Sequence, residues 1–71
     1  MNEVRYMAEL PKAPIKRIMK NAGAERVSED AVEQFRDRLE ELAEERAETA
    51  RSYTRNANRK TVQASDVKES F

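Results

Sequence analysis

The chain has 71 residues, so it forms at most one domain, and a chain this short has difficulty building a sufficient core without a staple or a partner. Cysteine and histidine are absent, which removes disulfides, thiol chemistry, the usual zinc ligands and the commonest acid–base catalyst. No apolar run approaches the roughly 18 residues of a membrane span, and no charged-then-apolar leader opens the chain. We therefore expect a cytoplasmic protein with no membrane association. One glycine and two prolines in so charged a chain favour helices over a sheet.

The net charge is zero, from 14 basic and 14 acidic side chains, which taken alone argues against nucleic-acid binding. The charges are nevertheless separated along the chain. Residues 12–26 hold five basic side chains and one acid, residues 29–48 hold nine acids and three arginines, and residues 51–60 hold four basic side chains and no acid. Charge alternation often marks only a well-solvated helical surface, but blocks this distinct favour two basic surfaces separated by an acidic one.

The first predicted element is a short helix over about residues 14–22. Pro14 is suited to the first helical position, where its missing N–H costs nothing. Ile15 and Ile18 recur at helical spacing and form one apolar stripe, and Gly23 is a natural C-terminal stop.

The second predicted element is a long helix over about residues 29–57. Ser28 is the expected N-cap, with two acids after it where the helix dipole favours them, and Asn58 is the expected left-handed stop. Arg46 interrupts the apolar stripe of this helix, so we expect its head to extend to solvent or to pair with an acid.

The third predicted element is a final helix of about two turns that begins near Ser65. Ala64, Val67 and Phe71 lie on one face of it, after an extended, basic connector at residues 59–62. The predicted fold class is therefore all-α, with a short helix, a long central helix and a short helix.

The length of the central helix indicates that a second chain is needed. A helix of about 29 residues is about 43 Å long, whereas a compact globule of this chain length is about 30 Å across. Two short flanking helices cannot cover the whole apolar stripe, so we expect a dimer. An antiparallel crossing of two central helices is the simplest solution, and it would set the first connector of one chain beside the second connector of the other.

Two stretches of the sequence carry a family resemblance. Residues 9–18 read ELPKAPIKRI and residues 21–28 read NAGAERVS, and together they closely resemble the opening of archaeal histones. The connector 59–62 reads RKTV, with Tyr53 and Thr54 before it and Asp66 after it, and it is similar to the same stretch of archaeal and eukaryotic core histones. The resemblance covers about residues 8–71. It indicates a histone-fold domain at 10–71 and an N-terminal extension at 1–9.

This resemblance implies a handshake dimer that binds and bends double-stranded DNA. Arg26 and Thr61 would form the side-chain pair that places an arginine in the minor groove, and Arg17 would approach the DNA at the centre of the dimer. Arg59 and Asp66 would form an ion pair that fixes the second connector. The residues expected to contact DNA are Lys12, Lys16, Arg17, Lys20, Arg26, Lys60 and Thr61.

The resemblance also implies an apolar dimer core and a surface through which dimers stack. Arg38, Arg46 and Arg51 stand where relatives often carry aliphatic residues, so the core is thin and intermolecular ion pairs would have to support it. The expected dimer core comprises Ile15, Ile18, Val32, Phe35, Leu39, Leu42, Tyr53, Val62 and Val67. The expected contact between dimers comprises Tyr53, Asn56, Asp66 and Glu69. Because Glu69 replaces an apolar residue with a carboxylate, we expect stacking to be weak.

The predicted function is that of a histone-like chromatin protein, located on the nucleoid, that binds, bends and compacts DNA with little sequence specificity. We expect a homodimer, or a heterodimer with another histone, with no cofactor, no metal and no enzymatic activity. The main alternative is a histone-fold subunit of a transcription or replication factor whose partner is a different chain.

Two further alternatives fit the sequence less well. A coiled-coil adaptor would need sustained heptads, and the central stripe is too irregular and short for them. An enzyme could use the carboxylate pairs Glu40/Glu44 and Glu41/Glu45 as metal ligands, but a di-iron bundle also requires a histidine three residues after a glutamate. Glycine-rich phosphate loops are absent too.

Overall fold

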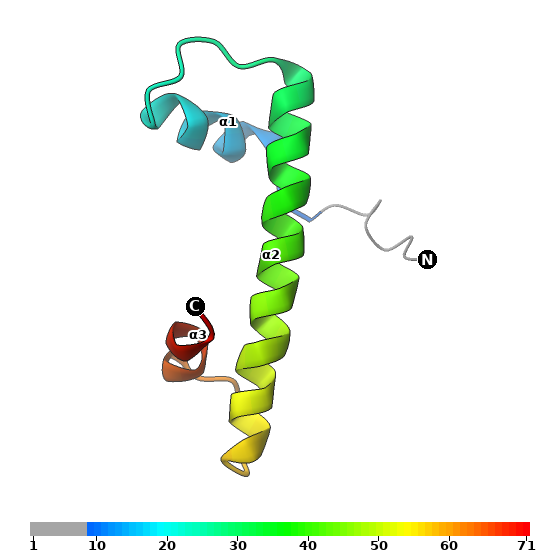
Figure 1. Ribbon diagram of the computed structural model, residues 1–71, viewed down its shortest axis with the longest axis vertical. Helices are drawn as coiled ribbons and strands as arrows, with labels where there is room; N and C mark the ends of the chain where they lie inside the picture. Colours follow the sequence, from blue (N-terminus) through cyan, green and yellow to red (C-terminus); the bar gives the residue numbers. More distant parts are fainter. Residues whose placement is uncertain (1–8) are drawn as a thin grey trace, which may run out of the picture. The chain divides into compact units, whose positions relative to one another are not determined.

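The computed structural model describes residues 9–71, which form three helices and no strand (Figure 1). Helix α1 spans Lys12–Asn21, α2 spans Glu29–Asn56 and α3 spans Ala64–Ser70. The predicted all-α order of short, long and short helices is thereby confirmed. Residues 1–8, which make up most of the predicted N-terminal extension, lie outside the described residues. The chain divides into two units, one ending at Glu40 and the other running from Glu41 to Phe71.

Helix α1 begins earlier than the sequence predicts. It starts at Lys12 with Pro11 as its N-cap, so Pro14 is the third helical residue and the prediction that it opens the helix is wrong. A proline is tolerated there because the first N–H groups of a helix have no acceptor within it. Gly23 ends the helix as expected: its φ is 113°, and its N–H donates to the Lys20 carbonyl at 3.0 Å.

Helix α2 has the predicted signals at both ends. The N–H of Ala31 donates to Ser28 Oγ at 3.1 Å, which makes Ser28 the N-cap. Past the other end, Asn58 adopts a φ of 60°, and the Arg59 N–H returns to the Thr54 carbonyl at 3.0 Å. Asparagine tolerates this left-handed conformation better than most residues, so the chain leaves the helix there. No helix in the described part of the chain is long and apolar enough to cross a bilayer.

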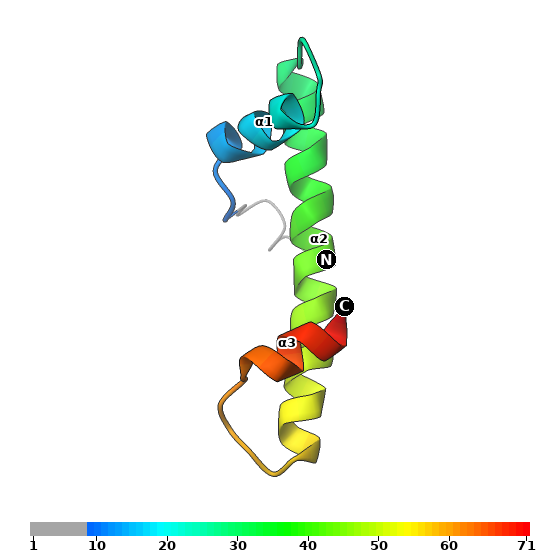
Figure 2. The same ribbon diagram turned by 90° about the vertical axis from the view of Figure 1, so that its left-hand side faces the viewer.

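In the first unit, α1 lies beside the N-terminal part of α2 (Figures 1 and 2). Ile15 from α1 and Val32 from α2 are buried, and Phe35 and Leu39 are half-buried. Ile18 remains half exposed although it belongs to the predicted dimer core. The apolar contact between the two helices is therefore small.

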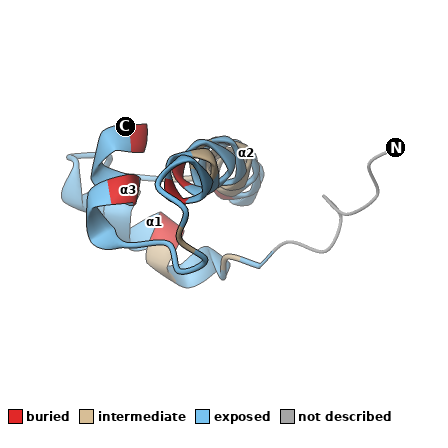
Figure 3. Ribbon diagram, turned by 90° about the horizontal axis from the view of Figure 1, so that it is seen from below, coloured by how far each residue is buried: buried red, intermediate tan, exposed pale blue. Residues whose placement is uncertain are grey.

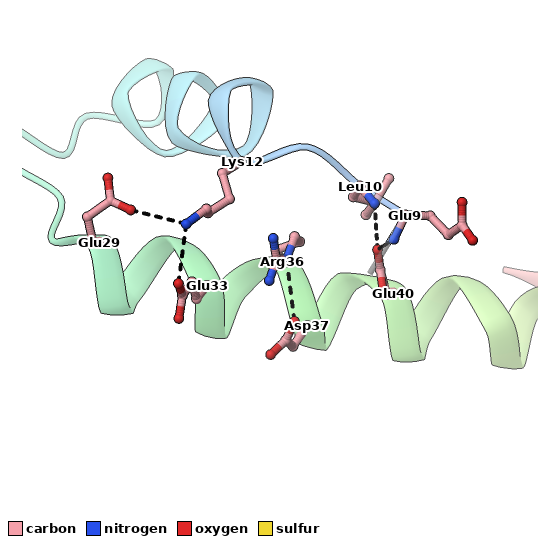
Figure 4. Close-up of polar contacts among 8 residues, drawn as sticks. All are labelled: Glu9, Leu10, Lys12, Glu29, Glu33, Arg36, Asp37 and Glu40. Carbon is pink, nitrogen blue, oxygen red and sulfur yellow. Dashed lines mark hydrogen bonds and ion pairs between the residues drawn. The ribbon is translucent and has the colours of Figure 1, made fainter. Parts of the chain in front are cut away.

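Polar contacts hold the segment before α1 against α2 (Figure 4). The backbone N–H groups of Glu9 and Leu10 both donate to Glu40 Oε2, at 2.5 and 2.6 Å. At the start of α1, Lys12 Nζ lies 3.4 Å from a carboxylate oxygen of Glu29 and 3.2 Å from one of Glu33. These contacts fix where the chain reaches α2 before α1 begins.

In the second unit, α3 packs on the C-terminal part of α2 through small and polar side chains. Ala50 is buried together with Thr54, Asp66 and Ser70. Arg46 corrects an expectation here, because its head lies on the end of α3 instead of extending to solvent. Its Nη1 donates to the Ser70 carbonyl at 2.8 Å, and the guanidinium lies 5.2 Å from the centre of the Phe71 ring. It thereby satisfies a carbonyl at the C-terminal end of α3.

Most of the ribbon in Figure 3 is coloured as exposed. Among the described residues, the buried hydrophobic side chains are only Ile15, Val32 and Ala50. Leu42 is 39% exposed and Tyr53 is 41% exposed, although both belong to the predicted dimer core. Val62 and Val67 are exposed as well. A single chain thus leaves much of its apolar surface in contact with water.

Removing the N-cap of α2 should destabilise the protein. We expect Ser28→Ala to lower the free energy of unfolding by about 1 kcal/mol, because the Ala31 N–H loses its acceptor. Urea denaturation at fixed protein concentration measures the change. Ser65→Ala, which replaces an exposed serine with no side-chain hydrogen bond among the described residues, is the matched control. Equal losses in the two variants would show that Ser28 does not act as a cap.

Candidate nucleic-acid interface

The connector between α2 and α3 is held by a buried carboxylate. Arg59 donates from Nη1 to Asp66 Oδ2 at 2.9 Å and from Nη2 to Oδ1 at 3.0 Å. Oδ2 also accepts from the Thr54 hydroxyl at 2.7 Å and from the Gln63 N–H at 2.9 Å. The side chain of Asp66 is only 5% exposed. A third contact, from Arg59 Nη1 to the Thr61 carbonyl at 3.2 Å, ties the middle of the connector to the same arginine.

These contacts settle the charge states of the pair. The Arg59 guanidinium, the Gln63 N–H and the Thr54 hydroxyl hold the pKa of Asp66 well below its ordinary value. In return, Asp66 raises the pKa of Arg59. Both groups are therefore charged at neutral pH, and the charge of Arg59 is balanced within the chain. Its role in this structure is to shape the connector.

The cations next to this pair are not balanced. Lys60 and Thr61 are exposed in the connector, and Arg51 and Arg55 are exposed on the last turns of α2. In the described part of the chain, no carboxylate forms an ion pair with Lys60, Arg51 or Arg55. The N–H groups of Lys60, Thr61 and Val62 likewise have no acceptor among the described residues. This surface offers positive charge and hydrogen-bond donors, which is what an anion requires.

A groove of about 570 Å³ opens on this surface. Sequence reasoning did not identify it, because it treats Arg51 only as a departure from an apolar core and gives Arg55 no role. The available signal was the run of residues 51–60 with four basic side chains and no acid. The groove is lined by Arg51, Thr54, Arg55, Asn58, Arg59, Lys60 and Val62.

The first unit presents the other predicted cations. Lys16, Arg17 and Lys20 are exposed on α1 and Arg26 is exposed in the connector that follows, with no ion pair to any described residue. Lys12 differs from them, because Glu33 and Glu29 bind its ammonium group and raise its pKa. A phosphate would have to compete with two carboxylates for Lys12, so it is the weakest candidate of the set.

The remaining predicted site residues divide by exposure. Tyr53, Asn56 and Glu69 are exposed. Asp66 is buried and hydrogen-bonded to Arg59, so its side chain offers almost no surface for a contact between dimers. Thr61 is exposed in the second unit and Arg26 in the first. No group of His, Cys, Asp or Glu among the described residues is arranged to hold a metal ion.

The family model for histone-like transcription factor (CBF/NF-Y) and archaeal histone matches residues 8–70. The chain belongs to this family. It is 55% identical over 62 residues to one of the subunits of archaeal histone HAN1 from Thermococcus zilligii, across 87% of this chain and 92% of that protein. It is 53% identical over 62 residues to probable archaeal histone 3 of Methanocaldococcus jannaschii, with the same coverage of 87% and 92%.

A third relative is more distant. The DNA-binding protein HmvA of Methanocaldococcus jannaschii is 40% identical over 60 residues, which are 84% of this chain and 62% of that protein. The family resemblance predicted from the sequence and its histone fold are thus confirmed. The relatives named as histones are structural proteins, which also confirms the prediction that the chain is not an enzyme.

The hydrogen bonds around Asp66 should make the free energy of unfolding depend on pH. Because folding lowers the pKa of Asp66, the ionised carboxylate contributes fully to this free energy above its ordinary pKa. The contribution is lost as the pH falls below that value. We expect Asp66→Asn to be less stable than the unmodified chain at pH 7, and the difference to shrink between about pH 5 and about pH 2. Thermal unfolding across this range measures it.

Glu69→Gln is the matched control, since this carboxylate is exposed on the same helix. Glu69→Gln should change the free energy of unfolding little at any pH in this range. A difference between Asp66→Asn and the unmodified chain that stays constant across the range would contradict the assigned role of the carboxylate.

Proposed function

We propose that this histone-family chain binds double-stranded DNA as a dimer, bends and compacts it with little sequence preference, and is associated with the nucleoid. The observation that carries the proposal is the connector after α2. The Arg59–Asp66 pair fixes its shape, so that Lys60, Thr61 and free N–H groups face outward with no acid among them. The relatives support the same function, since one of them is named as a DNA-binding protein.

The exposed apolar side chains support the dimer. Leu42 and Tyr53 on α2, Val62 in the connector and Val67 on α3 are all exposed in the single chain. If a partner covered these side chains, each Å² of apolar surface removed from water would contribute about 25 cal/mol to the stability of the dimer. Helix α2 has 28 residues and is about 42 Å long, so the cover must extend along a comparable length. A second histone-fold chain provides such a surface.

The mechanism follows from charges rather than from base contacts. Lys16, Arg17, Lys20 and Lys60 would neutralise phosphates and release counterions. Arg26, with Thr61, would enter the minor groove and respond to its width. No set of side chains suited to reading base edges is present on this surface, so sequence preference would follow DNA bendability. With a net charge of zero, binding depends on these local surfaces and should weaken steeply with salt.

Removing single DNA-contacting cations should weaken DNA binding without unfolding the protein. We expect Lys60→Ala and Arg26→Ala each to lower affinity, and Lys60→Ala also to reduce the slope of log K against log salt by about 0.9 for each phosphate that is no longer neutralised. Fluorescence anisotropy over a salt series measures both quantities. Lys68→Ala, which replaces an exposed lysine on α3, removes the same charge elsewhere and should leave the slope unchanged.

Two results would contradict this assignment. A flat salt dependence of the unmodified chain would show that phosphate contacts do not drive binding. Loss of folding in Lys60→Ala or Arg26→Ala would show that these residues are structural.

A second candidate function is that of a component of a transcription or replication factor with a different histone-fold partner. The family includes histone-like transcription factors, and one relative is named as a subunit. The small number of buried hydrophobic side chains in the described residues favours it too, because a partner built for this chain could supply the missing apolar cover. The two candidates differ in whether the purified chain dimerises with itself, and sedimentation of the chain alone decides between them.

A further inference from the structure

The groove at the C-terminal end of α2 gathers four cations around one hollow of about 570 Å³. One of them, Arg59, is committed to Asp66. The other three, Arg51, Arg55 and Lys60, have no carboxylate partner among the described residues, and no acid lines the groove. We call Arg51, Arg55 and Lys60, with the groove between them, the terminal groove.

The two arginines of the terminal groove repel each other in the free chain. Arg51 and Arg55 are four residues apart on α2 and therefore lie on the same helix face, where like charges destabilise a helix. In the described part of the chain no carboxylate forms an ion pair with either arginine, and the nearest acid before them on α2 is Glu48, three residues ahead of Arg51. An anion bound between them would remove the repulsion, so the arrangement is more favourable with a ligand than without one.

The position of the terminal groove on α2 argues against a second protein chain as the occupant. At about 100° per residue, Arg51 lies about 180° around the helix from Leu42, and Arg55 about 140° from it. Leu42 and Tyr53 are the exposed apolar side chains of this part of α2 that a partner would cover. A partner seated on them leaves Arg51 and Arg55 on the other side of the helix, away from the covered face.

The donors of the terminal groove match a phosphate group. Guanidinium groups bind phosphate oxygens in a bidentate manner, and an ammonium group adds a point charge. Lys60 and Val62 line the same hollow, and their backbone N–H groups have no acceptor among the described residues, so these groups are available for further oxygens. The Thr54 hydroxyl is already used by the Ala50 carbonyl and Asp66, so charge and backbone donors would form the site.

From this arrangement we propose that the terminal groove binds phosphate groups of a polyanion, with Arg51 and Arg55 as ligands in addition to Lys60. The phosphates come either from the DNA backbone or from a free inorganic polyphosphate. In the first case the inference rests on the proposed function and extends the DNA-binding surface from the connector onto the last turns of α2. In the second case the site is independent of DNA.

The test compares two variants of the full chain. Arg51→Ala with Arg55→Ala removes the groove arginines. Lys68→Glu makes the same change of two charge units at an exposed position outside the groove. Each protein is titrated with DNA over a salt series and with inorganic tripolyphosphate, and the oligomeric state is measured by sedimentation. Alanine is the best helix former, so the groove variant should stay folded.

We expect the groove variant to bind DNA about tenfold or more weakly, with a salt slope reduced by about 0.9 for each phosphate that is no longer neutralised, while the control variant keeps the slope of the unmodified chain. Loss of tripolyphosphate binding in the groove variant, with DNA binding unchanged, supports the site with a free polyphosphate as its source. If the groove variant equals the control with both probes, the inference is overturned.

Loss of the dimer in the groove variant alone would also overturn the inference, because the arginines would then contact the partner. An unmodified chain that fails to bind DNA contradicts the proposed function instead. The tripolyphosphate titration still tests the groove in that case.

Discussion

A single copy of this chain cannot cover the apolar side of its longest helix. Helix α2 contains 28 of the 71 residues, and the helices on either side of it are 10 and 7 residues long. Only three hydrophobic side chains are buried among the described residues, and Leu42 and Tyr53 remain in water. Unpaired surface of this kind is typical of an interaction site. The dimer, the alignment of two basic connectors and the proposed DNA-binding surface all depend on a partner covering it.

Charged and polar groups replace apolar packing within each unit. Glu40 binds two backbone N–H groups ahead of α1, Asp66 fixes the connector before α3, and Arg46 satisfies a carbonyl at the end of that helix. Buried charge is stabilising only where hydrogen bonds compensate its desolvation. Asp66 meets this condition through its bonds to Arg59, Thr54 and Gln63, whereas Nε of Arg46 is buried without a partner among the described residues. The interior of the second unit is therefore more polar than an aliphatic core would be.

The sequence is sufficient to predict those structural features that depend on one residue and its neighbours along the chain. Ser28, Gly23 and Asn58 mark helix ends because their backbone or side-chain chemistry acts locally, and the structure has them in those roles. Features set by tertiary contacts cannot be predicted in the same way. The helical position of Pro14 is mispredicted because several positions of a first turn tolerate proline. The place of Arg51 beside a basic groove becomes visible only once the connector is folded.

The same distinction separates the basic residues from one another. Residue type and spacing make Lys12, Lys16 and Lys20 look equivalent, but the fold places two carboxylates beside Lys12, whereas Lys16 and Lys20 form no ion pair with any described residue. The role of Arg59 depends in the same way on the buried Asp66, seven positions later in the chain. Charge along a sequence thus predicts where a basic surface lies, while the ion pairs within the fold determine which of its charges remain for a ligand.

Thermal unfolding of the unmodified chain over about a thousandfold range of protein concentration tests the need for a partner most directly. If folding requires a second copy, mass action raises the midpoint of unfolding as concentration increases, and we expect that rise. A cooperative transition with the same midpoint at every concentration, from a chain that sediments as a folded monomer, would contradict it.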